Sequence, residues 1–348
     1  MLKLLRSLLP GNSRDTEAAT SPAEVKPPAE IEAPGANSFD LLSHLSNEGG
    51  FPILDWEAAL AWVNSIPTAK ERGLALSDLE RAWLRHMQAA LGPSYDLRET
   101  EEAFLLSTLE PNVANATLAY VSKTLKRVVR VLDGIAKVPE WGKDILIVFE
   151  DDEPYYQYVA HYYAADGEFA ASSGMFISAG CGHFVTIKSD LRTIEPVVAH
   201  ELTHGCVSHL PIPAWLNEGL AVSTEHRLSP QGPPPFTPQQ MHAKHLAFWG
   251  KTEIQEFWSG KSFLRPDDGN MLSYDLARIL VSQLSKDWQA FRVFVLNADL
   301  ADAGSASAKE HLKLDLGAAV SAILEREPPG SYAPGPAEWH TSPERGGF

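Results

Sequence analysis

Apolar residues recur at helical spacing over the first folded stretch of the chain, residues 39 to about 135. The clearest case is residues 114–131, where apolar side chains return every three or four positions and predict a helix. The short apolar run at residues 104–106 fits either a strand or a buried helix segment, because periodicity cannot separate the two over three residues. We interpret residues 38–135 as a helical region that serves packing.

The pattern changes after residue 136, where short runs typical of strands follow one another. Residues 144–149 are rich in β-branched side chains and predict a buried strand. Residues 175–177 and 183–187 predict two more strands, joined by a segment that contains glycine. Either of these two strands could lie at the edge of a substrate cleft.

Helical patterns return in the later part of the chain. One helix is predicted from about Glu195 to Ser208, with Pro196 tolerated in its first turn, and a second from about Trp215 to His226. The remainder to about Leu324 also has helical spacing. Residues 136–326 are therefore predicted to form one α+β domain.

The two ends of the chain have a different composition. Residues 1–37 and 327–348 are rich in Pro, Ala, Glu, Ser and Gly and poor in large apolar side chains, which predicts disorder. Lys3 and Arg6 interrupt the apolar residues at the N-terminus, and no later stretch approaches the roughly 20 apolar residues of a membrane span. We therefore expect a soluble, cytoplasmic protein without an integral membrane segment.

Charge and cysteine content narrow the possible partners. The formal net charge is −16 and the sequence pI is about 5.2, so the chain repels phosphate backbones and nucleic acid is not expected as a partner. Cys181 and Cys206 are the two cysteines in the sequence, which provides no disulfide framework and fits a reducing compartment.

The segment His-Glu-Leu-Thr-His at residues 200–204 carries candidate chemistry. Histidines four positions apart on a helix project from one face, so His200 and His204 can converge on one zinc ion. Glu201 lies beside the first ligand, where its carboxylate can reach a water on the metal. The alternative is an amphipathic helix whose histidines form ordinary hydrogen bonds.

A second segment supplies a third ligand. Glu218 follows His204 by fourteen positions, and Trp215, Leu216 and Leu220 surround it with apolar positions on the next predicted helix. An unpaired carboxylate is costly in such surroundings, and a metal ion would satisfy it. Catalytic zinc takes three protein ligands and keeps one position open for water, which matches His200, His204 and Glu218.

At these two segments the sequence resembles the peptidase MA-like branch of the gluzincin zinc metallopeptidases, whose pattern is His-Glu-x-x-His followed by Trp-Leu-x-Glu-Gly-Leu-Ala. Residues 200–204 and 215–221 match this pattern at every ligand position. The resemblance covers residues 136 to about 324. It implies a thermolysin-like catalytic fold, with a small mixed sheet, active-site helices and a helical C-terminal part, one Zn²⁺ per chain, and a peptide or protein substrate.

The resemblance also implies roles for single residues. Glu201 would accept a proton from the zinc-bound water and deliver it to the leaving amine. Related enzymes use a later Tyr or His to stabilise the tetrahedral intermediate, and the segment around Tyr274 resembles their tyrosine-bearing helix, although Tyr274 also fits a packing role. Asn217 could orient a ligand, whereas Glu225 is expected on a solvated helix face, with an orienting role as its alternative.

Three other functions stay open at this stage. The chain could be a non-catalytic binding protein that retains the peptidase fold, a zinc hydrolase acting on a non-peptide amide, or a protein with a structural zinc site. The intact Glu201 argues against the first, and the shortage of cysteine argues against the last. His183 has no partner at ligand spacing and is interpreted as an ordinary strand histidine. The sequence does not indicate the oligomeric state.

Overall fold

The central sheet of the protein is built from both halves of the sequence. In the computed structural model, which describes residues 26–138, 142–162, 174–177, 179–189, 191–229, 232, 234–326 and 332–341, five strands form one sheet. Their spatial order is β5 (Asp96–Glu99), β6 (Ala103–Ser107), β7 (Asp144–Phe149), β9 (His183–Ile187) and β8 (Gly174–Ile177). The three middle strands are parallel, whereas β5 and β8 pair antiparallel at the two edges.

The three strands predicted after residue 136 are confirmed as β7, β8 and β9. The prediction that residues 38–135 are helical is wrong in part, because this stretch also contributes β5 and β6 to the same sheet. The physical reason is burial on both faces: Phe104 and Leu106 enter one core and Leu105 enters the other, so the strand has no alternation of apolar and polar residues. A domain boundary near residue 135 would cut through this sheet.

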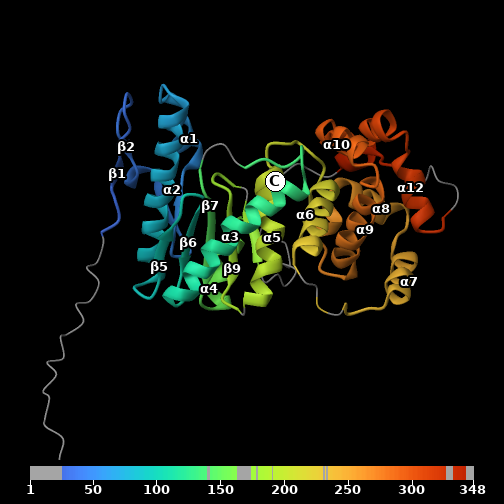
Figure 1. The fold of residues 1–348 in the computed structure, drawn as a ribbon, viewed down its shortest axis with the longest axis horizontal. Coiled ribbons are helices and arrows are strands. Elements are labelled where there is room, and N and C mark those ends of the chain that lie inside the picture. The colour runs from blue at the N-terminus through green and yellow to red at the C-terminus, as the bar shows by residue number, and fades with distance from the viewer. Residues whose placement is uncertain are drawn as a thin grey trace, which may run out of the picture.

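Helices cover both faces of the sheet (Figure 1). Successive residues of each strand point to opposite sides, so that Leu146 packs with α3 and α5 while Ile145 and Ile147 pack with the helices on the other side. One face carries α3 (Pro111–Val131) and α5 (Leu191–Val207); the other carries α1 (Trp56–Ser65), α2 (Ala69–Leu91) and α4 (Asp152–Tyr162). The metal-motif helix α5 therefore packs with its apolar side directly against the sheet.

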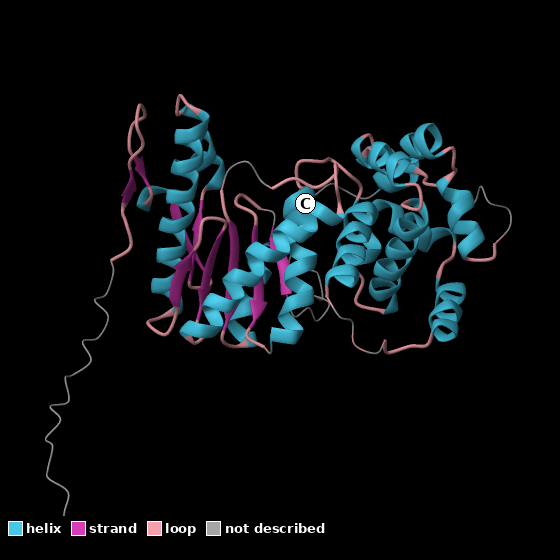
Figure 2. Cartoon of the chain, in the orientation of Figure 1, coloured by secondary structure: helices cyan, strands magenta, loops and turns pink. Residues whose placement is uncertain are grey.

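A helical part lies beside the sheet layer, as Figure 2 shows. Trp215 lies at its centre, fully buried, with ring contacts to Phe257, Trp258 and Phe294. The helices are α6 (Ala214–Leu228), α7 (Pro238–Phe248), α8 (Lys251–Ser259), α9 (Asp268–Leu284), α10 (Trp288–Leu296), α11 (Ser305–Ser307) and α12 (Leu316–Ile323). The structure is thus a mixed α+β fold with a helical C-terminal part.

The ends of the chain contain more structure than their composition predicts. Residues 30–31 form strand β1 (Glu30–Ile31), which pairs with β2 (Phe39–Asp40), and a hairpin of β3 (Leu45–Glu48) and β4 (Phe51–Leu54) follows. Tyr332 and Trp339 pack on the helical part, and a 3₁₀ helix spans Pro336–Thr341. The predicted disorder is corrected for these segments, while residues 1–25, 327–331 and 342–348 lie outside the described residues.

No helix among the residues that the structure describes combines the length and the apolar character needed to cross a membrane.

Glu80 is a buried carboxyl group in α2, and it accepts a hydrogen bond from the backbone N–H of Lys143 at 3.0 Å. Burial raises the pKa of Glu80 from 4.5 to about 8, so the folded protein favours the protonated form. The stability that this protonation contributes is fully present below about pH 4.5 and is lost as the pH rises through about 8.

We therefore expect Glu80→Gln, which keeps the acceptor oxygen and cannot ionise, to raise the free energy of unfolding at pH 8.5 by roughly 1–3 kcal/mol and to leave it nearly unchanged at pH 4.5. Urea unfolding at the two pH values measures this. Glu57→Gln, at an exposed site on α1, is the control. An equal effect of the two substitutions at pH 8.5 would contradict the raised pKa of Glu80 in the folded protein.

Candidate metal centre

The helix α5 presents both histidines of the motif on one face. The ring centroids of His200 and His204 lie 4.8 Å apart, as expected for residues one turn apart. The helix begins at Leu191, earlier than predicted, so Pro196 lies in the second turn rather than the first. Its other side, with Val198, enters the core against the sheet and fixes the direction in which the histidines project.

Glu218 reaches the two histidines from α6. Its Oε2 lies 3.3 Å from Nε2 of His200 and 3.5 Å from Nε2 of His204. Ligand atoms that surround zinc tetrahedrally at 2.0–2.1 Å are about 3.3–3.4 Å from one another, so these separations match the edges of a zinc site. Among the residues that the structure describes, His200, His204 and Glu218 form the one cluster that could hold a metal ion.

Gly219, next to Glu218, allows α6 to approach α9 closely. A Cβ atom at this position would lie 2.8 Å from the carbonyl oxygen of Ala277 and 2.7 Å from the side chain of Val281. Real Cβ atoms do not tolerate such contacts, so a residue with a side chain would push the two helices apart. Gly219 therefore keeps α6 close to α9, and this fixes the position of Glu218 on α6.

Each histidine is oriented by a second hydrogen bond. Nδ1 of His204 lies 2.9 Å from Oδ1 of Asn217, and Nδ1 of His200 lies 3.2 Å from Oε2 of Glu225. When Nδ1 donates to these oxygens, Nε2 carries the free lone pair that a metal needs. The expected solvated helix face for Glu225 is therefore wrong, because the packing of α6 on α5 brings this carboxylate to the ring of His200.

We expect Asn217→Ala to lower zinc affinity about 10–100-fold, because His204 would lose the acceptor that fixes its ring. Competition with a fluorescent zinc chelator measures the affinity. Ser208→Ala, at an exposed position just beyond α5, serves as the control. An unchanged affinity in Asn217→Ala would show that packing alone holds the ring of His204.

The charges at the site compensate one another. Burial acts to lower the pKa of His200, but the neighbouring carboxylates of Glu218 and Glu225 outweigh this effect and raise the pKa to about 10. Without a metal, the His200 ring therefore carries a proton at neutral pH, and a metal ion would have to displace it from Nε2. Burial acts to raise the pKa of Glu218, but the neighbouring His204 and His200 hold it well below its usual range. The Glu218 carboxylate is therefore ionised at neutral pH, as a metal ligand must be.

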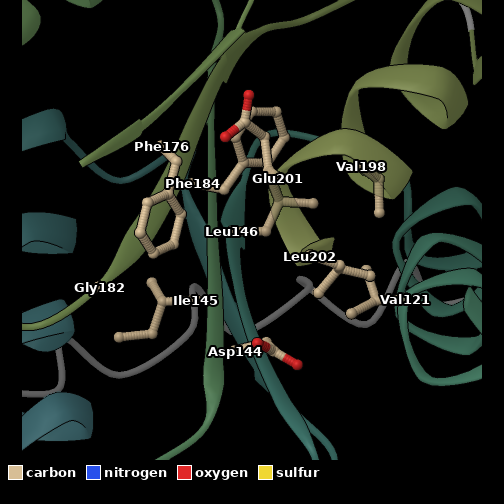
Figure 3. Close-up of a pocket in the computed structure, with 10 residues that line it drawn as sticks. All are labelled: Val121, Asp144, Ile145, Leu146, Phe176, Gly182, Phe184, Val198, Glu201 and Leu202. Carbon is tan, nitrogen blue, oxygen red and sulfur yellow. The ribbon is translucent and has the colours of Figure 1, made fainter. Parts of the chain in front are cut away.

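Glu201 follows His200 directly on α5, between the two histidine ligands, and is 7 % exposed. Burial raises the pKa of its carboxyl group, and its Oε2 has no hydrogen-bond partner among the residues that the structure describes. Glu201 also lines a small cavity between α5 and the sheet, with Asp144 at the opposite end and apolar side chains such as Leu146 and Leu202 between them in Figure 3. The buried oxygen without a partner fits a water molecule held beside a metal ion.

Two aromatic residues flank the histidines. The ring of Tyr274, in the second turn of α9, lies 6.3 Å from the ring of His200 and 5.1 Å from that of Phe263. Phe176, on the edge strand β8, lies 6.3 Å from the ring of His204. The structure brings Tyr274 beside the predicted ligands. The strand that contains Phe176 was a candidate for the cleft edge, but Phe176 itself was not singled out, because one aromatic residue in a short strand does not indicate which way its ring points.

His183 lies away from the metal cluster, as its interpretation as an ordinary strand histidine predicts. It is fully buried, and its Nε2 lies 2.7 Å from the hydroxyl oxygen of Tyr158 while its Nδ1 lies 2.8 Å from the carbonyl oxygen of Cys181. Burial lowers the pKa of His183 to about 4, so the ring is neutral and satisfied inside the second core.

Comparisons with models of known protein families and with curated proteins find no match to this chain. The candidate metal centre is therefore supported by its own motif and geometry, namely by three convergent ligands, two orienting partners and one buried carboxylate beside them.

Proposed function

We propose that this protein is a zinc-dependent peptidase of the gluzincin type with a thermolysin-like arrangement of its active site. The observation that carries the proposal is the approach of Glu218 to both histidines at 3.3 and 3.5 Å, with the buried Glu201 carboxylate on the same helix. A His-Glu-x-x-His segment that arose by chance would not be expected to have a carboxylate from another helix beside both histidines. Here that carboxylate also lies at the ligand-to-ligand distance of a tetrahedral zinc site.

Each residue of the site has its own role in the proposed reaction. Zinc, when bound by His200, His204 and Glu218, supplies a Lewis acid and a water of lowered pKa. Glu201 accepts the proton of the attacking water on its free Oε2 and delivers it to the leaving amine. Tyr274 donates a hydrogen bond to the oxygen on which negative charge develops. Glu225 and Asn217 keep the two imidazole rings in place during these steps.

Strand β8 gives the substrate a place beside the metal. In the part of the sheet that the structure describes, β8 is the last strand, whereas β9 lies between β7 and β8. Of the two candidate strands, β8 is therefore the one at which a further strand can be added on this side. It also contacts α5 and places Phe176 beside His204. An extended peptide paired with β8 would therefore pass along the histidines, which favours a peptide over a compact small-molecule amide.

Metal removal tests the proposal directly. The purified protein is incubated with a peptide library before and after treatment with a strong chelator, and again after addition of one equivalent of zinc, and the products are identified by mass spectrometry. We expect cleavage that chelation abolishes and zinc restores. Stoichiometric zinc without any cleavage would instead support a non-catalytic protein that retains this fold for binding.

A further inference from the structure

The cavity between α5 and the sheet has a carboxyl group at each end (Figure 3). Glu201 lies at one end, on the helix that carries the histidine ligands, and Asp144, the first residue of β7, lies at the other. The walls between them are apolar and include Val121 of α3, Leu146 of β7, Phe184 of β9, and Val198 and Leu202 of α5. Such a cavity suits a side chain that has an apolar stem and a polar end.

The cavity extends over about one helical turn. Oδ1 of Asp144 lies 3.8 Å from the position that a Cβ atom would take at Gly205. Gly205 follows Glu201 by four residues, and four residues advance an α-helix by about 6 Å. An extended lysine side chain, with a four-carbon stem and a terminal ammonium group, bridges a similar separation.

Asp144 has no counter-ion of its own. Its backbone N–H donates to the carbonyl oxygen of Glu102 at 2.9 Å, but its side chain makes no hydrogen bond or ion pair with the residues that the structure describes. The neighbouring Lys143 binds elsewhere, because its Nζ lies 2.6 Å from Oε1 of Glu99 and 2.6 Å from the carbonyl oxygen of Thr100. Burial, together with the negative charge of Glu102, raises the pKa of Asp144 to about 7.

We propose that this cavity is the specificity pocket of the proposed peptidase, and that it takes a lysine side chain of the substrate next to the scissile bond, with Asp144 as the residue that selects the lysine. The inference rests on the proposed function, because the position of Glu201 at one end of the cavity places the pocket beside the scissile bond only if Glu201 is the catalytic base. The formal net charge of −16 also attracts cationic peptides to the protein.

The chemistry of the two partners is complementary. The ammonium group of the bound lysine stabilises the ionised form of Asp144, which burial alone disfavours. The methylene stem replaces water along the apolar walls. Lysine fits better than arginine, because a guanidinium group is a planar fork and needs more width than a compact ammonium group.

Paired substrates test the pocket in the full-length protein with zinc bound. The peptides carry either lysine or norleucine beside the cleaved bond, since norleucine has an apolar stem without the charge. We expect kcat/KM to be at least about tenfold higher with lysine, and Asp144→Asn, which is isosteric, to bring this ratio close to one. Asp133→Asn, at an exposed position just beyond α3, is the control and should keep the lysine preference. Equal hydrolysis of both peptides by the parent, or a lysine preference that survives in Asp144→Asn, would overturn the proposal.

A binding measurement that needs no hydrolysis separates a failed pocket from a failed peptidase proposal. n-Butylamine is the lysine side chain from Cβ outward, and 1-butanol has the same stem without the charge. At millimolar concentrations we expect n-butylamine to raise the Tm of the parent above that of Asp144→Asn measured with the same amine, each relative to its own value without amine, and 1-butanol to make no such difference. Stabilisation that depends on Asp144, without cleavage of any peptide, would support the cation pocket and contradict the peptidase activity. Equal effects of n-butylamine on the two proteins would contradict the pocket, whatever the activity.

Discussion

Glu218→Ala is expected to lose stoichiometric zinc. The substitution removes one of three ligands and leaves two neighbouring histidines without the carboxylate that lies 3.3 and 3.5 Å from them. Loss of a direct ligand should exceed the roughly 10–100-fold effect of losing an orienting residue, so we expect affinity to fall by at least about 1,000-fold. Elemental analysis after dialysis against a weak chelator should give one zinc per parent chain and almost none in the variant.

The controls separate a lost ligand from a damaged fold. Glu57→Ala removes an exposed carboxylate on α1 and should keep its zinc. Glu218→Asp retains the charge on a shorter side chain and should bind zinc with intermediate affinity. One zinc per chain in Glu218→Ala would mean that the ion is bound elsewhere, and it would remove the observation on which the proposed function depends.

The metal centre could be predicted because its geometry is largely local. Two ligands four positions apart in a helix lie on the same side of it, independently of the rest of the fold. The matching segment around Glu218 indicated a third ligand. The orienting roles were less certain, because whether Glu225 faces His200 or water depends on how α6 lies against α5. The position of α6 depends in turn on the close contact between Gly219 and α9. A contact between two helices leaves no local pattern in the sequence.

The parts of the fold that were missed share a physical cause. Strand β6 is buried on both faces, so its residues carry no period by which a strand could be recognised. The segment 332–339 has the composition of a disordered tail, yet two aromatic side chains and the hydrogen bonds of Gln255 hold it in place. Composition averages over a segment, whereas docking depends on a few anchors.

Glu201→Gln is expected to abolish peptide hydrolysis while zinc content stays at one per chain. Glutamine has nearly the shape of glutamate but cannot take up the proton of the attacking water. Proton transfer by a positioned side chain contributes about 10²–10⁴-fold to a rate, so kcat should fall by at least about 100-fold. Because Glu201 binds no metal in the proposed site, elemental analysis should not distinguish the variant from the parent.

The pair of measurements on Glu201→Gln separates the possible functions. Lost hydrolysis with retained zinc supports the assignment of Glu201 as the base, because a collapsed site would lose both. Lost zinc would mean that the Glu201 carboxylate holds the site together electrostatically, next to His200 and His204. Unchanged hydrolysis at matched zinc content would exclude Glu201 as the base. A buried carboxylate whose Oε2 has no hydrogen-bond partner in the described part of the chain would then need another explanation.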